Sequence, residues 1–362
     1  MRVKVPGGPE TEYRVVIGSG ILASVWSQIK AAHSGFNRFV VTDEHVVAAG
    51  YLGTLLGGRP APHFVVKPAG EISKTIDTAV AVVETMEKAY LGRNTVVIAL
   101  GGGTVGDIAG FAAAIFKRGV PVVQVPTTTL AQADSAIGGK TGVDSSVSKN
   151  AFGAFWHPAA VYIDVAAVAT LDDRQYRSGL VESVKHGLIA DAACFELIEG
   201  RLDAILARDH GTLETLAGHN CRIKGGVVAE DPLEKNKRRI LNYGHTIGHA
   251  VEAASQYTIL HGEAVAVGIM AAGLIEARLG LSEPGQFDRI RAVLERLGVP
   301  TKLPASLSDE KVLELLRHDK KAVDQWPRFV LLDRLGQVHR EDGQYAVQVA
   351  REVVEKALKE LR

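Results

Sequence analysis

Three histidines and a glutamate of this chain have the residue types and spacing of a metal site. His245 and His249 are four residues apart, so on a helix they lie on one face. His261 follows them closely, and Glu182 lies upstream. Divalent metals bind neutral imidazoles and carboxylates that converge in this way. The histidine pair alone is also compatible with a polar surface patch, but the third histidine and the glutamate favour a metal ion.

A glycine-rich segment, GGGTVGD at residues 101–107, has the features of a phosphate-binding element. It directly follows a predicted strand over 95–100 and precedes a predicted helix over 108–116. Glycines let backbone N–H groups approach a phosphate, and a helix N-terminus adds a favourable dipole. The spacing differs from the Gly-x-Gly-x-x-Gly of the common Rossmann fold, and a simple tight turn is the alternative interpretation.

Hydroxyls, an amide and lysines follow in glycine-rich loops. The threonines of 126–128 come after a predicted strand, at the carboxyl edge of the sheet where open α/β sheets bind ligands. Asp134, Lys140 in GGKTG, and the pair Lys149 and Asn150 come next. This combination suits a phosphorylated, hydroxylated small molecule, although any single lysine is more often a solvated surface charge.

Glu182 and Lys185 are three residues apart in a predicted helix and therefore share one of its faces. Two interpretations remain open, because position alone does not separate them. The residues form either a surface ion pair, which contributes roughly 0.2–0.5 kcal/mol, or a metal-binding carboxylate beside an ammonium group that contacts substrate.

The first half of the chain alternates predicted strands and helices. Strands are predicted over 38–42, 95–100, 120–125 and 161–163, which are short apolar runs rich in β-branched residues. Residues 73–91 have the periodicity of an amphipathic helix and stop at a glycine. The β-α-β order predicts an α/β, Rossmann-like N-terminal domain with a parallel sheet covered by helices.

Beyond residue 171, helical patterns replace the strand patterns. Helices are predicted over 173–190, 194–207, 213–228, 244–255, 263–279 and 286–297. We therefore predict a mostly helical, all-α C-terminal domain that binds the metal. The expected boundary lies between residues 164 and 170, which gives domains of residues 1–168 and 169–362.

Composition limits the classes of function. The 362 residues contain 41 basic and 41 acidic side chains, so no net field attracts nucleic acid or a membrane surface. Two cysteines without a Cys-x-x-Cys spacing fit a reducing compartment. The N-terminal sequence lacks the apolar core of a signal peptide, and no apolar run reaches the length of a membrane span. We expect a cytoplasmic protein with a small-molecule ligand.

Six segments together resemble the 3-dehydroquinate synthase family, which belongs to the sugar phosphate cyclases. They are, in order, GGGTVGD, PTTTLAQADSAIGGKTG, KNAFGAFWHP, GLVESVKHG, LNYGHTIGHAVE and LHGEAVAVG, within residues 71–321. The resemblance implies a dehydroquinate synthase-like fold, related to metal-dependent glycerol and alcohol dehydrogenases. It implies a lyase that converts 3-deoxy-D-arabino-heptulosonate 7-phosphate to 3-dehydroquinate and phosphate, in the shikimate pathway to chorismate and aromatic amino acids. NAD, one divalent metal ion (Zn²⁺ or Co²⁺) and a homodimer are implied with it.

The resemblance also implies roles for individual residues. The implied metal ligands are Glu182, His245 and His261, which leaves His249 to contact substrate. The remaining substrate-side residues are Lys185, Lys224, Arg238 and Asn242 for the carboxylate and hydroxyls, Lys140, Asn150 and Lys320 for the phosphate, Asp134 near both ligands, and Arg118, which reaches across the dimer. The NAD-side residues are Asp43, Gly70, Glu71, Lys74, Gly103, Thr104, Val105, Gly106, Asp107, Thr127, Thr128, Lys140, Lys149 and Thr170.

In the implied reaction, NAD oxidises a substrate hydroxyl, phosphate leaves by β-elimination, and the hydride returns before ring opening and aldol closure. Thr104, Asp144 and Ser148 depart from the family pattern. The loop 231–237 is also more basic than the expected Asp-Glu-Arg-Glu pattern. None of these departures removes an implied ligand, but the last can change the order of the loop near Arg238.

Two other classes of function remain. The first is a cyclase for another sugar phosphate or a polyol dehydrogenase with net NAD reduction. The implied carboxylate contacts favour an acid substrate, and a dehydrogenase has no use for the implied phosphate contacts. The second is a scaffold with a structural metal, in which some of these ligands would be expected to have been lost.

Overall fold

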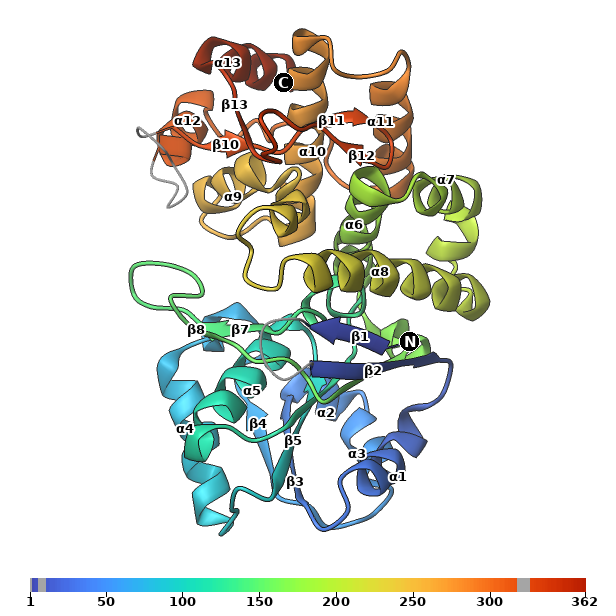
Figure 1. Ribbon diagram of the computed structural model, residues 1–362, viewed down its shortest axis with the longest axis vertical. Helices are drawn as coiled ribbons and strands as arrows, with labels where there is room; N and C mark the ends of the chain where they lie inside the picture. Colours follow the sequence, from blue (N-terminus) through green and yellow to red (C-terminus); the bar gives the residue numbers. More distant parts are fainter. Residues whose placement is uncertain (1, 6–10, 318–325) are drawn as a thin grey trace. The chain divides into compact units, whose positions relative to one another are not determined.

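The computed structural model describes residues 2–5, 11–317 and 326–362. The chain divides into two compact units, Met1–Asp172 with Leu213–Ala229, and Asp173–Thr212 with Glu230–Arg362 (Figure 1). The first unit thus ends close to the expected boundary, but it also contains most of helix α8 (His210–Glu230), which the sequence boundary assigns to the second domain. Among the described residues, no helix combines the length and the apolar character that a membrane crossing requires.

A seven-stranded sheet forms the centre of the first unit. Its strand order is β1-β2-β9-β6-β5-β3-β4, and all neighbouring strands are parallel except the edge pair β1 and β2. The strands are β1 (Arg2–Val5), β2 (Thr11–Gly18), β3 (Asn37–Asp43), β4 (His63–Val66), β5 (Thr95–Gly101), β6 (Val122–Pro126) and β9 (Ala160–Asp164). The predicted parallel sheet is therefore confirmed, and β1 adds an antiparallel edge.

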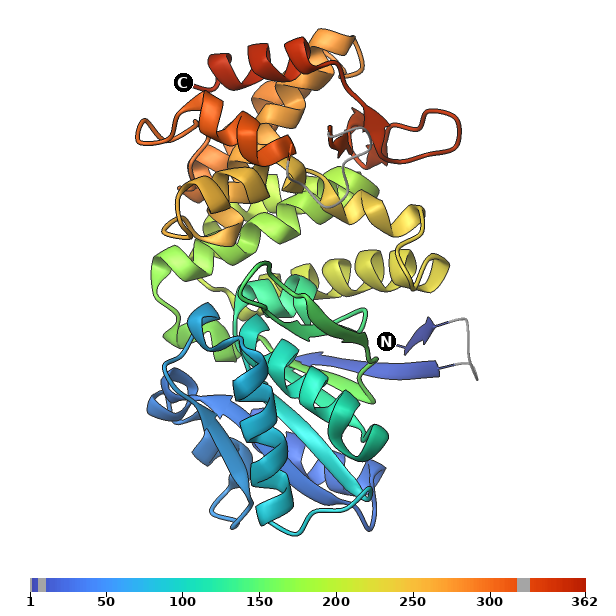
Figure 2. The ribbon, with the colours of Figure 1, turned by 90° about the vertical axis from the view of Figure 1, so that its left-hand side faces the viewer.

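Helices cover both faces of this sheet, because successive residues of a strand point to opposite faces. Val97 and Ala99 of β5 pack with α4 (Ile76–Lys88) and α5 (Gly103–Ile115), which lie in front of the sheet in Figure 2. Val96, Ile98 and Leu100 pack on the other face, with α1 (Leu22–Ala32), α2 (Glu44–Ala48) and α3 (Tyr51–Leu56). Burial on both faces explains why β5 is a continuous apolar run.

Helices α4 and α5 begin three or more residues away from their predicted starts. Helix α4 begins at Ile76 rather than residue 73, because the Thr75 hydroxyl caps it by accepting the Thr78 N–H at 3.2 Å. Helix α5 begins at Gly103, so residues 103–107 form its first turns and not a separate loop before residue 108. The tight turn between β5 and α5 is confined to the glycines just before Gly103.

Shorter elements complete the first unit. The hairpin of β7 (Lys140–Val143) and β8 (Phe152–Phe155) packs near α5. Single turns are found at η1 (Glu71–Ser73), η2 (Phe116–Arg118), η3 (Ala131–Ser135) and η4 (Val165–Thr170). The η3 turn is π-helical, a conformation that is often found at functional sites.

The second unit is built around helix α10 (His261–Leu279), in which every residue from Gly262 to Glu276 is buried. Helix α10 packs against α6 (Asp173–Ala190), α9 (His245–Ala254), α11 (Gln286–Leu297) and α13 (Arg351–Glu360). Helices α7 (Ala192–Leu206) and α12 (Asp309–Arg317) and the turn η5 (Lys237–Asn242) complete the helical part. The predicted helical domain is confirmed.

Two small antiparallel sheets were not predicted in this unit. They pair β10 (Arg328–Phe329) with β13 (Val347–Gln348), and β11 (Leu332–Arg334) with β12 (Gln337–Val338). Strands of two or three residues are too short to show an alternating pattern, so no pattern in the sequence predicted them.

Candidate active site

Glu182, His245 and His261 come together in the second unit from three different helices. The Nε2 atoms of both histidines lie 3.6 Å from the same carboxylate oxygen, Oε1 of Glu182. One potential ligand atom from each residue lies within 4.8 Å of the others. Glu182 is only 1% exposed, so this carboxylate is almost entirely removed from solvent. The three residues that the family resemblance implied as ligands therefore converge on one point.

Glycines allow these helices to approach each other so closely. A Cβ atom at Gly268 of α10 would lie 1.8 Å from the carbonyl oxygen of Gly244, the residue before His245. A Cβ atom at Gly262, the residue after His261, would lie 1.8 Å from the carbonyl oxygen of Ser178 on α6. Any side chain at these two positions would push α9 or α6 away from α10. The short distances among the candidate ligands thus depend on backbone contacts.

Hydrogen bonds fix the orientation of both imidazole rings. His245 Nδ1 lies 3.0 Å from the carbonyl oxygen of Tyr243, and His261 Nδ1 lies 3.2 Å from Oε2 of Glu252. Both partners accept a hydrogen, so Nδ1 carries a proton in each ring and Nε2 is the nitrogen that faces Glu182. A carboxylate or carbonyl behind a histidine is the usual arrangement around protein-bound metals. Glu252 was not among the predicted site residues; it stands seven residues after His245 on the same helix face.

The electrostatics of this cluster favour a cation. Burial, assisted by the Lys185 ammonium, holds the pKa of His245 well below its usual range. Burial also lowers the pKa of His261, but Glu182 and Glu252 outweigh it and raise that pKa to about 9. Lys185 forms an ion pair with Glu182. The carboxylates around His261 thus attract positive charge, and one carboxylate with two imidazoles is a donor set that fits a divalent zinc or cobalt ion.

His249 lies at the edge of the cluster. Its ring centroid is 5.2 Å from that of His245 and 5.9 Å from that of His261. The side chain is exposed, and its potential ligand atoms group with Glu252 and His261 rather than with Glu182. This position is compatible with a contact to a ligand beside the metal.

Arg238 and Asn242 belong to the segment 231–242, which has its own internal support. The Asp231 carboxylate accepts the backbone N–H groups of Lys235, Asn236 and Arg238 at 2.7–3.0 Å. Burial raises the pKa of Asp231, but these N–H groups outweigh it and lower that pKa. The buried Arg238 donates from Nη1 to the Pro232 carbonyl at 2.7 Å.

Asn242 is held by a second carboxylate of the same segment. Its Nδ2 donates to Oε1 of Glu234 at 2.9 Å. Glu234 was not among the predicted site residues either. It adopts a left-handed conformation with φ 58°, which is uncommon for glutamate and cannot be predicted from the residue type.

Several NAD-side residues of the first unit lie at the carboxyl ends of the parallel strands. Asp43 ends β3, residues 103–107 follow β5, and Thr127 and Thr128 follow β6. The chain adds β4 on one side of β3 and β5 on the other, so the ends of β3 and β5 flank a topological switch point. Ligands of open α/β sheets bind at such points.

The first turn of α5 is suited to a phosphate. Its N-cap, Gly102, makes no side-chain hydrogen bond to the helix. A Cβ atom at Gly102 would lie 3.0 Å from Thr128 Cγ2, and one at Gly103 would lie 3.1 Å from Ser135 Oγ. Open N–H groups beside small residues and hydroxyls fit the pyrophosphate of a dinucleotide. Val105 is 1% exposed and packs in the core, so only its backbone is available to such a ligand.

Four further NAD-side residues form one charged network. Lys74 Nζ lies 2.7 Å from Asp107 Oδ2 and 3.8 Å from Glu71 Oε1. Glu71 also lies 3.4 Å from Lys149 Nζ and accepts the Thr104 hydroxyl at 3.2 Å. Burial lowers the pKa of Lys74, but the nearby carboxylates outweigh it and raise that pKa. Thr104, which departs from the family pattern, thus has a partner.

Among the other candidate residues, Lys224 contacts Asp134, whereas Arg118 lies far from the first turn of α5. Lys224 Nζ lies 2.8 Å from Asp134 Oδ2 and donates to the Asp134 carbonyl at 2.5 Å. The Asn150 N–H donates to Asp144 Oδ1 at 2.6 Å. Arg118 lies beyond the C-terminal end of α5, roughly 20 Å from its first turn by helix geometry.

Three further candidate residues are exposed. Gly70 precedes η1 with φ 100°, Lys140 is exposed at the start of β7, and Thr170 is exposed and donates to the Tyr51 hydroxyl at 3.3 Å. Lys320 lies outside the described residues.

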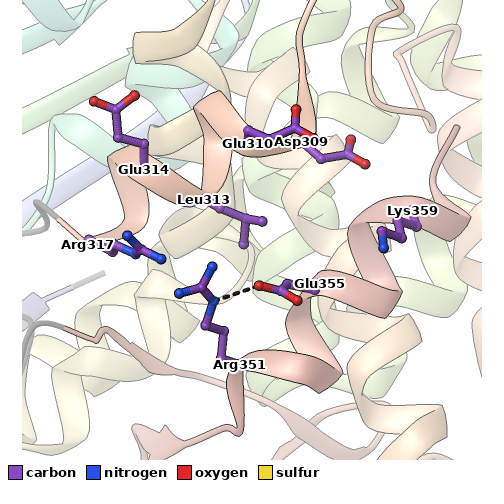
Figure 3. Close-up of a pocket in the computed structure, with 8 residues that line it drawn as sticks. All are labelled: Asp309, Glu310, Leu313, Glu314, Arg317, Arg351, Glu355 and Lys359. Carbon is purple, nitrogen blue, oxygen red and sulfur yellow. Dashed lines mark hydrogen bonds and ion pairs between the residues drawn. The ribbon is translucent and has the colours of Figure 1, made fainter.

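A surface hollow of about 340 Å³ lies elsewhere in the second unit, between α12 and α13 (Figure 3). Charges of both signs line it, and Arg351 pairs there with Glu355 at 2.6 Å. Its lining residues are Asp309, Glu310, Leu313, Glu314, Arg317, Arg351, Glu355 and Lys359. None of them is a candidate site residue.

A Rossmann-like unit with an open phosphate-binding helix end, followed by a helical unit with a Glu-His-His cluster, defines a dinucleotide- and metal-binding class of α/β protein. Comparison with known proteins specifies the family. Family models described as 3-dehydroquinate synthase N-terminal and C-terminal match residues 64–178 and 179–322. The chain belongs to the 3-dehydroquinate synthase family.

Individual relatives agree with this assignment. The 3-dehydroquinate synthase of Acidithiobacillus ferrooxidans is 44% identical over 332 residues, which cover 90% of each chain. A solved 2-deoxy-scyllo-inosose synthase, complexed with carbaglucose-6-phosphate, NAD⁺ and Co²⁺, has a TM-score of 0.88 at 29% identity, with 100% of both chains covered. ValA, a 2-epi-5-epi-valiolone synthase from Streptomyces hygroscopicus with NAD⁺ and Zn²⁺ bound, has a TM-score of 0.87 at 29% identity, covering 99% of this chain and 98% of that one.

Proposed function

We propose that this protein converts 3-deoxy-D-arabino-heptulosonate 7-phosphate to 3-dehydroquinate and inorganic phosphate, a carbon–oxygen lyase step of the shikimate pathway. The observation that carries the proposal is the cluster of Glu182, His245 and His261, in which both Nε2 atoms face one buried carboxylate oxygen. The family assignment supports the substrate, because relatives at 40–45% identity are 3-dehydroquinate synthases.

We assign two cofactors to separate units. A divalent metal, Zn²⁺ or Co²⁺, is held by Glu182, His245 and His261, and NAD by the strand ends around Asp43 and Gly103. Structural neighbours at 29% identity contain NAD⁺ with Co²⁺ or Zn²⁺, which supports both assignments. When bound, the metal acidifies and orients a substrate hydroxyl, and NAD accepts and returns the hydride.

The side chains contribute mainly binding and orientation. Glu252 and the Tyr243 carbonyl hold a proton on Nδ1 of each imidazole, so Nε2 is the nitrogen available to the metal. We assign Arg238 and Asn242, with Lys185, Lys224 and His249, to the carboxylate and hydroxyls of the substrate. An arginine fork suits a planar carboxylate. Lys140, Asn150 and Lys320 are assigned to the phosphate, and Asp134 helps to position Lys224.

A homodimer in the cytoplasm completes the proposal. Arg118 lies far from the first turn of α5 in its own chain, which supports a role at the site of a partner subunit rather than its own. Both cysteines are buried and neither forms a disulfide, as suits a reducing compartment. We keep the functional division into an NAD-binding domain, about residues 1–168, and a metal- and substrate-binding domain, about residues 169–362. Lys224 comes from helix α8, most of which belongs to the first compact unit.

One assay tests the function. Purified protein with Zn²⁺ or Co²⁺, a catalytic amount of NAD and the heptulosonate phosphate is expected to release phosphate without accumulating NADH. Accumulation of one NADH per substrate would instead indicate a polyol dehydrogenase. Phosphate release from glucose 6-phosphate but not from the heptulosonate would indicate a cyclase for a substrate without a carboxylate.

A further inference from the structure

The loop 231–237 is more basic than the family pattern, and its Asn236 and Lys237 side chains contact the turn 341–345 of the same unit. We propose that this turn is a latch that holds the loop in the conformation in which Arg238 binds the substrate carboxylate. Asn236 and Tyr345 are then positioning residues for substrate binding. This inference rests on the proposed function of Arg238 and extends it to residues that do not touch substrate.

The loop determines directly where the Arg238 guanidinium lies. Nη1 of Arg238 donates to the carbonyl oxygen of Pro232, a residue of the same loop, at 2.7 Å. Glu234, in the middle of the loop, accepts from Asn242 Nδ2 at 2.9 Å. A change in loop conformation would therefore displace both Arg238 and Asn242, which are assigned to the substrate.

Asp231 holds the backbone of the loop through three N–H groups. The latch holds the loop through the Asn236 side chain. Asn236 Nδ2 donates to the Gly343 carbonyl at 3.0 Å, and Asn236 Oδ1 accepts the Tyr345 N–H at 3.4 Å. The Asn236 amide thus pairs with the turn through both its donor and its acceptor. Such reciprocal pairing fixes the orientation of the Asn236 side chain as well as its distance from the turn.

A ring contact adds to these hydrogen bonds. Lys237 Nζ lies 5.1 Å from the centroid of the Tyr345 ring and 3.5 Å from its hydroxyl. The Arg340 guanidinium lies 4.9 Å from the same ring centroid. Cations over an aromatic ring are attracted by its negative face. Lys237, one of the basic residues of this loop, therefore has a specific partner.

The turn 341–345 is closed by its own backbone hydrogen bonds. Glu341 and Gln344 exchange backbone hydrogen bonds of 3.1 and 2.9 Å. Asp342 and Gly343 between them have φ values of 50° and 78°. Positive φ at both central residues is the pattern of a type I′ turn, for which Asp-Gly is a preferred sequence. The local sequence thus preorganises the surface that receives Asn236.

The experiment compares Asn236→Ala and Tyr345→Ala with the wild type. Loss of the latch leaves a smaller fraction of molecules with Arg238 in place, so the KM for the heptulosonate phosphate is expected to rise about 3- to 10-fold in each variant. The kcat is expected to stay within about twofold, because the metal and NAD sites are untouched. Tyr345→Phe keeps the ring and is expected to retain most of the wild-type KM.

A readout that needs no turnover accompanies the kinetics. Trypsin cuts after Lys235 and Lys237, and cleavage there in the substrate-free protein is expected to accelerate several-fold in Asn236→Ala and Tyr345→Ala. The matched control is Gln337→Ala, an exposed residue of β12 that bonds to Asp333 rather than to the loop. Its KM and its cleavage rate are expected to equal those of the wild type.

The outcomes separate the latch from the proposed function. Wild-type protein that releases no phosphate refutes the proposed function, whereas faster loop cleavage in Asn236→Ala still supports a latch on the loop. An unchanged KM and an unchanged cleavage rate in both alanine variants, in an active wild type, would overturn the latch. So would a fall in kcat with an unchanged KM.

Discussion

Replacement of Glu252 by alanine is expected to weaken metal binding without unfolding the protein. The Glu252 carboxylate is 7% exposed and accepts the Nδ1 hydrogen of His261 over 3.2 Å. Without it, the imidazole can rotate and can exchange its two tautomers, of which only one presents Nε2 to the metal. The backbone carbonyl of Glu252, which bonds to Ser255 and Tyr257, is unaffected by the substitution.

The size of the effect follows from this single bond. Loss of the partner behind a metal-binding histidine typically lowers metal affinity about 10- to 100-fold, which corresponds to roughly 1.4–2.8 kcal/mol. Glu252→Gln keeps an acceptor oxygen but loses the charge. Since charge-assisted hydrogen bonds are about twice as strong as neutral ones, it is expected to lose about half of that free energy.

The measurement uses metal-free protein and no substrate. Zn²⁺ is titrated in competition with a chromophoric chelator, and the visible spectrum of bound Co²⁺ reports the ligand geometry. Glu276→Gln is the control, because Glu276 is also a buried carboxyl of this unit but accepts from the Leu332 N–H at 2.8 Å. If Glu252→Ala folds and binds Zn²⁺ within twofold of the wild type, the reasoning about ring orientation is wrong.

Three other outcomes are expected. Burial raises the pKa of Glu276 to about 8, so its contribution to stability is complete below its ordinary pKa and is lost as the pH rises through 8. The wild type should therefore lose about 1.4 kcal/mol per pH unit across that window relative to Glu276→Gln, and melting curves at pH 5, 7 and 9 with no divergence would contradict this. Gly268→Ala forces α10 away from Gly244 and should lower both the Tm and the Zn²⁺ affinity, whereas an unchanged Tm would show that the helices can adapt. Arg238→Lys loses the bidentate fork and should raise the KM about tenfold or more, which steady-state kinetics would contradict if the KM were unchanged.

Strong local patterns allowed correct prediction of most elements. Helices α6 and α11 have the predicted bounds of 173–190 and 286–297, and amphipathic periodicity with a following glycine defines those of α11 locally. Strand β5 was evident because burial on both faces requires a continuous apolar run. Helix α5 begins earlier than predicted because packing against the sheet overrides the low helix propensity of Gly103 and Gly106.

The missed features depend on contacts between distant residues. Glu252 orients His261 only because α9 and α10 pack side by side, and nothing in the local sequence distinguishes it from a surface glutamate. The contacts of Asn236 lie more than a hundred residues away in the chain, at the turn around Gly343. Such pairs follow from tertiary structure and leave no periodic signal.

The composition of the first unit has a consequence for protein engineering. Because residues 213–229 belong to this unit, a fragment that stops at Asp172 would lack the partner of Asp134, Lys224. A chimera that exchanges the Rossmann-like half between two family members must therefore transplant two separate stretches of sequence. A single crossover at the apparent boundary would pair a helix from one parent with a sheet from the other.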